Sequence, residues 1–413
     1  MIKQKLEIIY KFIDYSLIFF PIALILGAPA VNLYLATYSI IFLYLSINLN
    51  FLEWHKENWI KIIFIFWLYL IFISLFATDY VNALRSSFFF IRYLFFSLLI
   101  GYFGFKIIKF ENIFKIWFFI LLAVVIDVWV QFALGVDIFG IEKRGDRLSG
   151  LFGDELILGA FIWKLSCPII SLIVLKFFLN GDIIYKKYLI ACSILPVTVL
   201  ISGERMSFVM YLFFLIATAT YLSFYKKKLK LFFGLIVVCI FSLLIIFSNI
   251  SSVKNRYQEF YNIVENFGSS SYGKLFVSGF ELWKKNPVIG VGLKNFRIEC
   301  DEQLENREPI LHPLCSTHPH NLYLEILSET GIVGFLLFIS FVATFLGRYF
   351  NLNLFLKNND KNFFFVVTLL ISFISFIWPI STSGSFFTTW NGSFYWMIIG
   401  LIIFFTNQKK LTI

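Results

Sequence analysis

The sequence contains few charged residues. Asp, Glu, Lys and Arg make up 15% of its 413 residues, against roughly 25% in a soluble domain. Apolar residues make up 59%, which leaves too little polar surface to cover a soluble globule and excludes a disordered chain. With only nine prolines and 23 glycines it is not collagen-like, and five cysteines exclude a small disulfide scaffold. The remaining class is a membrane protein with several spans.

Long apolar runs occur throughout the chain. A run of roughly 20 residues crosses a bilayer core of about 30 Å as a helix, and lipid-exposed backbone cannot form strands with open edges or loops. We therefore predict an all-α polytopic membrane protein with twelve transmembrane helices and no cleavable signal peptide. The predicted spans cover residues 12–28, 29–47, 59–77, 88–105, 113–134, 155–179, 188–202, 207–225, 231–249, 321–346, 362–378 and 393–408.

These spans divide the chain into three parts. Residues 1–249 form a membrane domain with nine spans, and residues 321–413 form one with three. Between them lies one long loop, residues 250–320. Within that loop, Leu, Phe and Trp recur at helical spacing over residues 273–285 with lysines opposite. This pattern predicts an amphipathic helix on the membrane surface.

The distribution of Lys and Arg predicts the orientation. With the N-terminus in the cytoplasm, twenty Lys and Arg fall on the inner side and five in the short outer loops. Long loops are exempt from this rule, so residues 250–320 do not alter the balance. We expect both termini inside and loop 250–320 outside. Orientation in a membrane accounts for the +10 net charge better than a nucleic-acid partner does.

Arginine is distributed differently from lysine. Seven of the nine Arg fall on the predicted outer face, whereas the inner basic residues are almost all Lys. Either this is chance, or the outer face binds anions with planar guanidinium groups. Arg205 lies in a short turn between two spans, where it either binds an anion or only reaches the lipid interface. Arg147 precedes a helix that we expect Asp154 to cap, and is either a second anion contact or a surface cation.

Arg92 lies inside a predicted span, seven residues after Arg85 on the same helical face. A charge at that depth is costly and is usually paired or functional. Asp127 in the next span is the candidate partner. We expect either a structural ion pair between Arg92 and Asp127 or a role for Arg92 in binding substrate.

Three histidines and two cysteines lie near the end of the outer loop. His312, His318 and His320 form a metal site, supply a general base, or are polar loop residues; intervening prolines argue against a helical pair of metal ligands. Cys300 and Cys315 are either free thiols or a disulfide. In an oxidising compartment a disulfide closing a loop of about fifteen residues would contribute roughly 3 kcal/mol.

The segment after His318 resembles the signature of the O-antigen ligase and O-antigen polymerase superfamily. That signature is His, then Asn, Ser or Gln, then nine residues, Gly, two residues and Gly; here it is matched by His320, Asn321, Gly331 and Gly334. Residues 147–155, 202–205 and 286–297 resemble the same family. The signature does not separate ligases from polymerases.

The resemblance implies a metal-independent, inverting glycosyltransferase without a cofactor in a bacterial inner membrane. The donor would be a glycan linked to undecaprenyl pyrophosphate, transferred in the periplasm to lipid A-core by a ligase. A polymerase would transfer it to another lipid-linked repeat unit. In this reading His320 is the base and Arg205 and Arg147 hold the pyrophosphate. A lipid or solute transporter is the alternative from another class, although no inverted repeat supports it.

Four further residues complete the predicted substrate site. Asn321 or His318 fixes the tautomer of the base or the acceptor. The family often carries a second Arg near the start of the amphipathic helix, but Tyr272 or Lys274 stands there in this chain. Lys274 supplies charge without a planar fork, and Arg297 is expected to compensate.

Overall fold

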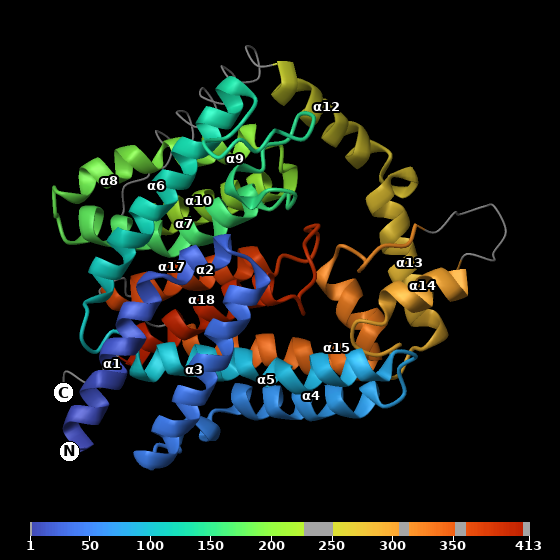
Figure 1. The fold of residues 1–413 in the computed structure, drawn as a ribbon, viewed down its shortest axis with the longest axis horizontal. Coiled ribbons are helices and arrows are strands. Elements are labelled where there is room, and N and C mark those ends of the chain that lie inside the picture. The colour runs from blue at the N-terminus through green and yellow to red at the C-terminus, as the bar shows by residue number, and fades with distance from the viewer. Residues whose placement is uncertain (1, 227–250, 305–313, 352–360, 408–413) are drawn as a thin grey trace.

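The computed structural model describes residues 2–226, 251–304, 314–351 and 361–407. Over these ranges the chain is helical and contains no β-strand, as the all-α prediction requires. Long helices lie side by side, with α7 and α18 among the most buried (Figure 1). Both helices are apolar on nearly all sides, a pattern typical of helices enclosed by other protein elements or lipid.

Among the described residues, seven helices are long and apolar enough to cross a membrane, so the prediction of twelve spans is not confirmed. The seven are α3 (Ala28–Asn48), α5 (Tyr80–Phe103), α6 (Phe110–Leu134), α7 (Leu158–Val174) with its π-helical continuation (Leu175–Leu179), α10 (Arg205–Lys226), α15 (Leu322–Tyr349) and α18 (Thr389–Asn407). Two shorter apolar helices, α4 (Asn58–Ser74) and α17 (Lys361–Phe376), lie on other predicted spans.

The other predicted spans differ from single long helices. The first is divided into α1 (Ile2–Ile18) and α2 (Phe20–Ile25), and the seventh into α8 (Tyr185–Cys192) and α9 (Ile194–Ile201). Each division lies close to a proline, Pro21 or Pro196, which has no N–H to donate to the preceding turn. The predicted ninth span, residues 231–249, lies outside the described residues.

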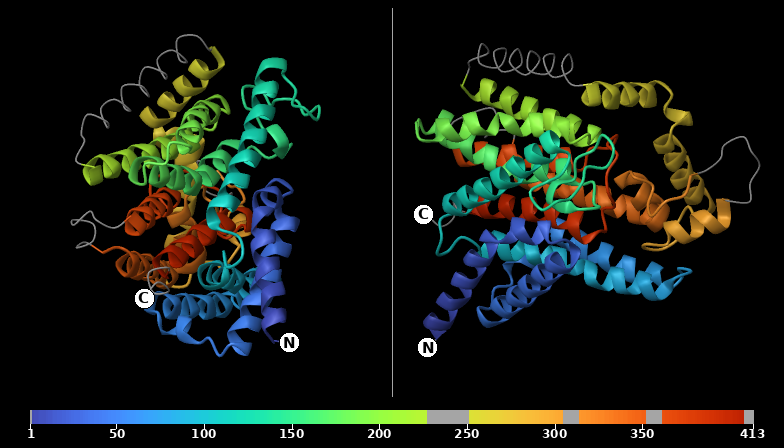
Figure 2. Two further views of the ribbon diagram at one scale, coloured as in Figure 1. Left: turned by 90° about the vertical axis from the view of Figure 1, so that its left-hand side faces the viewer. Right: turned by 45° about the horizontal axis from the view of Figure 1, so that its top comes forward.

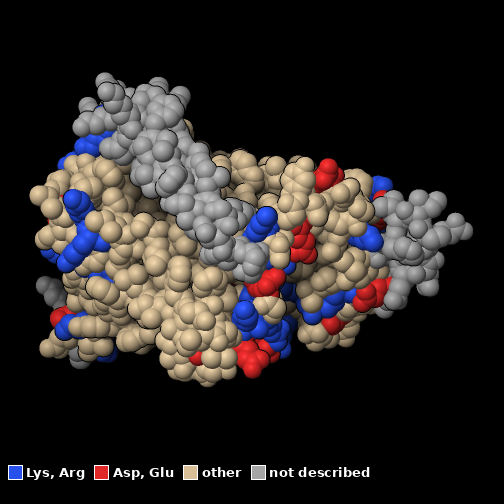
Figure 3. Space-filling model, turned by 90° about the horizontal axis from the view of Figure 1, so that it is seen from above, with Lys and Arg blue, Asp and Glu red and all other residues tan. Residues whose placement is uncertain are grey.

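The chain runs back and forth between two ends of the helical bundle (Figures 1 and 2). The start of α1 and the end of α18 lie at one end. At the other end stand α12 (Ser251–Glu265), α13 (Ser271–Lys285) and α14 (Phe296–Leu304), which belong to the predicted long loop. On the face seen in Figure 3, a zone with few charged side chains lies between a group of Lys and Arg at the left end and a group of both signs that extends from the centre into the right half. This distribution suits a bundle whose middle lies in lipid.

The structure contains a close backbone contact between residues 287–292 and α15. Gly331 interrupts α15 with φ +64°, and the backbone there meets Pro287 and Val288. The N–H of Ile332 donates to the carbonyl of Pro287 at 2.9 Å. A Cβ atom on Gly331 would lie 2.2 Å from the oxygen of Val288. Two of the segments that resemble the family therefore pack directly on each other.

Replacing Gly331 with Ala should destabilise the protein by at least about 1–3 kcal/mol, because this backbone conformation is almost confined to glycine and Val288 leaves no room for a methyl group. The loss of stability is measured as the decrease in the midpoint of thermal unfolding, which size-exclusion chromatography of the heated protein in detergent monitors. Gly347→Ala is the matched control on the same helix, since nothing lies within 4 Å of its Cβ position. Equal midpoints for the two variants would contradict the argument.

Candidate functional site

Two histidines lie together immediately before α15. The ring centroids of His318 and His320 are 4.2 Å apart. His320 has φ +54°, an uncommon conformation for a residue with a side chain. The loop between α17 and α18, residues 377–388, fastens this segment. The N–H of Ser383 donates to the carbonyl of His320 at 2.9 Å, and Nε2 of His318 lies 3.2 Å from the carbonyl oxygen of Ser383.

The two imidazoles differ in their hydrogen bonds. In His318 both ring nitrogens are engaged: Nδ1 lies 3.0 Å from Oγ1 of Thr317, and Nε2 meets Ser383. Among the described residues no hydrogen bond engages the ring of His320. His320 is therefore the imidazole of this pair with ring nitrogens available to a substrate.

Burial lowers the pKa of both histidines to about 4. For His318, the hydrogen bond to Ser383 opposes this effect, whereas the charges of Lys294 and Arg297 add to it. For His320, His318 lowers the pKa further and the carboxyl group of Glu325 raises it. Both rings are consequently neutral near pH 7, so a ring nitrogen that makes no hydrogen bond can accept a proton.

Asn321 uses its whole side-chain amide within the protein. Its Oδ1 caps α15 by accepting hydrogen bonds from the N–H groups of Tyr323 and Leu324 at 3.0 and 3.1 Å. Its Nδ2 donates to the carbonyl oxygens of Pro379 and Ser381. The residue at this signature position thus begins the helix and holds the 377–388 loop beside the histidines.

Three arginines from separate parts of the chain interact with one another, and we call Arg147, Arg205 and Arg256 the guanidinium cluster. Arg205 begins α10, Arg256 lies on α12, and Arg147 lies in the loop before α7. Electrostatic interactions connect all three. Nη1 of Arg205 and Nη1 of Arg256 both donate to Oε2 of Glu259, at 3.1 and 2.8 Å.

Tyr272, the second residue of α13, connects the two groups. Its ring centroid lies 6.0 Å from that of His320, in an edge-on arrangement. The same tyrosine interacts electrostatically with Arg147 and Arg205. Tyr272 thus contacts the predicted base and acts electrostatically on the two predicted phosphate ligands, which come from separate parts of the chain.

Glu204 does not bind the neighbouring Arg205. Its carboxylate accepts hydrogen bonds from the N–H groups of Gly159 and Ala160, at 2.6 and 3.1 Å, and so caps the start of α7. The prediction that Asp154 caps this helix is wrong, because Asp154 pairs with Arg144 instead. The cap comes from a residue distant in sequence, and it also leaves a negative charge near Arg147.

The expected ion pair between Arg92 and Asp127 is also wrong. Arg92 donates to Oγ1 of Thr389 at 3.2 Å, and its guanidinium lies over the ring of Tyr93. Asp127 instead accepts a hydrogen bond from the N–H of Ile138 in the following loop. The two side chains belong to consecutive predicted spans, but α5 packs on α3, α4 and α18, whereas α6 packs mainly on α7, so the two side chains have different partners.

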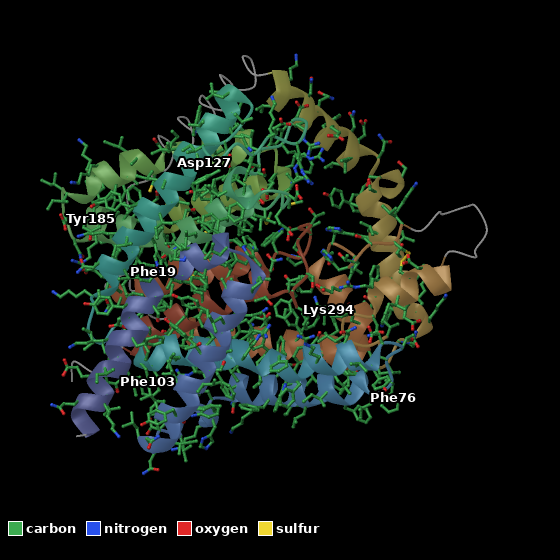
Figure 4. All side chains as sticks on the ribbon, viewed as in Figure 1. Phe19, Phe76, Phe103, Asp127, Tyr185 and Lys294 are labelled. Atoms are coloured by element: carbon green, nitrogen blue, oxygen red, sulfur yellow. A yellow bond between two sulfur atoms is a disulfide. The ribbon has the colours of Figure 1, made fainter. Side chains whose placement is uncertain are left out.

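Charged groups that the sequence did not single out support the 377–388 loop. Nζ of Lys294, labelled in Figure 4, lies 3.3 Å from Oγ of Ser385. The buried carboxyl group of Glu325 accepts a hydrogen bond from the N–H of Phe386 at 2.8 Å. On α7, the buried Lys164 donates to Asn391 within a surround of aromatic rings: Trp163, Phe376, Trp390, Phe394 and Tyr395.

The remaining predicted site residues lie near this region with less defined contacts. Lys274 is half-buried on α13, two residues after Tyr272. Arg297 is exposed at the start of α14 and acts electrostatically on His318. Arg256 and Glu259 were missed because the sequence offered only their spacing of three residues, which is common on surface helices.

A disulfide joins Cys300 and Cys315, with Cα atoms 5.7 Å apart. Cys300 is buried with Leu282, Val291 and Phe296, in a small apolar cluster separate from the main core. The disulfide therefore links α14 to the segment that leads into the histidines. Over the described part of the chain, no three His, Cys, Asp or Glu side chains gather as metal ligands. His312 lies outside that part.

Comparison with known families identifies part of the chain. Residues 190–339 match the family model of O-antigen ligase, which confirms the resemblance noted from the sequence. The matched region contains Arg205, Arg256 and the histidine segment, but not Arg147. A search of curated proteins found no match.

Proposed function

We propose, from the premise that residues 190–339 are an O-antigen ligase domain, that this protein is a glycosyltransferase acting on a lipid-linked donor. The membrane-embedded helices and the family match support an enzyme of the O-antigen ligase and polymerase type. The observation that carries the finer proposal is the neutral His320, connected through Tyr272 to the guanidinium cluster. A base and an anion site lying together suit transfer from a glycosyl pyrophosphate.

The guanidinium cluster is assigned to the donor. Cleavage of the bond between sugar and pyrophosphate leaves several negative charges on the departing group, and fixed cations stabilise such charge in a site that excludes water. Guanidinium groups offer two parallel N–H donors to phosphate oxygens. Arg205 and Arg256 supply them from two helices, and Arg147 adds a third positive charge.

His320 is assigned to the acceptor. Its neutral ring takes the proton from a sugar hydroxyl as that oxygen forms a bond to the anomeric carbon of the donor. The electron pair of the old carbon–oxygen bond leaves with the pyrophosphate, and attack from the opposite face inverts the configuration. His318, with both ring nitrogens engaged, holds the 377–388 loop and so positions His320.

The end of the bundle that carries α12, α13 and α14 is assigned to the periplasm. The bias of Lys towards the other end, where α1 begins and α18 ends, supports this orientation. The enzyme would then work on the outer side of a bacterial inner membrane. The donor is a glycan on undecaprenyl pyrophosphate, and the favoured acceptor is lipid A-core.

Reconstituted protein should transfer the glycan when supplied with the lipid-linked donor and purified lipid A-core. Gel electrophoresis of the lipid products measures the transfer. If the product is instead a longer glycan on the polyprenyl carrier, formed from two donor molecules, the protein is a polymerase. Movement of donor across the bilayer with no covalent product would contradict both enzyme assignments and favour a transporter.

A further inference from the structure

Glu259 is unusual among the contacts of the guanidinium cluster. A single carboxylate oxygen, Oε2, accepts from both Arg205 and Arg256. The carboxylate is 55% exposed, whereas the arginine side chains are 13% and 19% exposed. An exposed anion thus covers two largely buried cations.

The cations beneath this carboxylate repel one another. Arg256 acts unfavourably on both Arg147 and Arg205, and Arg147 acts unfavourably on Arg205. The other nearby carboxylate, Glu204, is committed to the start of α7. Glu259 is therefore the carboxylate that offsets the mutual repulsion of Arg205 and Arg256, with one oxygen for two guanidinium groups.

The guanidinium cluster retains hydrogen-bonding capacity with Glu259 in place. Arg205 donates through Nη1 alone in the described structure, to Glu259 and to the carbonyl of Arg256. Nε of Arg256 and Nε of Arg147 are buried and have no partner there. A phosphoryl group presents more oxygens and more charge than a carboxylate does, and would satisfy donors that Glu259 leaves unused.

We propose that Glu259 occupies the place of a donor phosphoryl group in the ligand-free protein, and that a bound diphosphate displaces it. Glu259 then sets the affinity of the site by competing for Arg205 and Arg256. This inference rests on the proposed function, since it takes the guanidinium cluster as the donor site. The ligand chemistry is a diphosphate, whether linked to a lipid or free.

An ion pair that is merely structural and one that competes with ligand predict opposite results. Glu259→Gln removes the competing charge, so it should tighten binding of inorganic pyrophosphate by up to about fivefold, the equivalent of an exposed ion pair of 0.2–1 kcal/mol. Arg256→Gln should weaken binding by about tenfold or more, since it removes a charged hydrogen-bond donor. Isothermal titration of the purified full-length protein with pyrophosphate measures both.

Two substitutions on the same helix control for the change of charge. Glu265→Gln removes an equal negative charge, and Lys254→Gln removes a positive one, both from exposed positions on α12. Each should leave the affinity within about twofold of wild type, because exposed charges at a distance are screened. A gain of affinity confined to Glu259→Gln cannot arise from misfolding.

The outcomes separate this inference from the proposed function. Pyrophosphate binding by Glu259→Gln that is equal to or weaker than that of wild type overturns the inference, even where glycan transfer is normal. Tighter binding in a protein that transfers no glycan supports the anion site and counts against the enzyme.

The titration is repeated in nanodiscs of phosphatidylcholine with and without phosphatidylglycerol. Loss of pyrophosphate binding with phosphatidylglycerol would assign the site to a phospholipid headgroup and overturn the diphosphate assignment.

Discussion

Glycan transfer should be lost in the His320→Ala variant while the protein still accumulates in the membrane. His320 is the histidine of the pair with ring nitrogens not engaged by the described protein, and a positioned base contributes about 10²–10⁴-fold to rate. Surface-glycan ladders in cells and transfer by reconstituted protein measure the loss. We expect a smaller loss for His318→Ala, because its ring positions His320 through the 377–388 loop but does not itself take the proton.

His55→Ala is the control for replacing a histidine elsewhere. His55 lies in the short 3-10 helix Glu53–Lys56, outside the site, and its replacement should leave the rate unchanged. The pH profile gives a second check. Because the pKa of His320 is lowered to about 4, the neutral base persists as pH falls from 7 to 5, and kcat/KM falls only below that. Persistent ladders in His320→Ala would refute the assignment of the base.

Arg205→Ala should reduce the rate of transfer by about 10²–10³-fold, which is roughly 2.7–4 kcal/mol of transition-state stabilisation. Arg205 begins α10 within the guanidinium cluster, and its side chain is only 13% exposed. Arg205→Lys should restore only part of the rate, because an ammonium group keeps the charge but loses the planar pair of donors. Initial rates at saturating acceptor, with the donor varied, give kcat and KM for each variant.

Arg144→Ala provides the matched control for Arg205→Ala. Arg144 lies half-exposed in the loop between α6 and α7, and pairs with the exposed Asp154. Exposed pairs of this kind contribute about 0–1 kcal/mol, so the variant should keep nearly all activity. Equal losses in the two variants would show that the general positive charge around the site, and not the position of Arg205, governs the rate.

The signature around His320 was readable from the sequence because its spacing is local. The side chain of Asn321 caps α15 by accepting hydrogen bonds from the N–H groups of Tyr323 and Leu324, and Gly331 has φ +64° within the same helix. Arg205 was found for a similar reason, since a short turn between two apolar runs must lie at one end of the bundle. What Gly331 packs against, however, was outside the reach of spacing, because Val288 comes from a separate segment.

The predictions that were wrong concern contacts between segments that lie far apart in the sequence. Asp154 stands before α7 as a cap would, yet Glu204 takes that place from 45 residues away. Arg92 and Asp127 lie on consecutive predicted spans, but a helical pattern does not tell which helices pack together, and α5 packs on α18 whereas α6 packs on α7. Arg256 was one of many charged residues in a long loop. Its meaning comes from the path of α12, which carries it to Arg205.

By itself the sequence determined that this protein is helical, membrane-embedded and equipped with a histidine signature, because apolar length, charge distribution and local spacing are properties of the chain alone. Only the tertiary structure decided which helices and loops surround His320, which carboxylate covers the arginines, and which histidine nitrogens are free of hydrogen bonds. Those depend on contacts between segments far apart in sequence, and such contacts are set by how the helices pack.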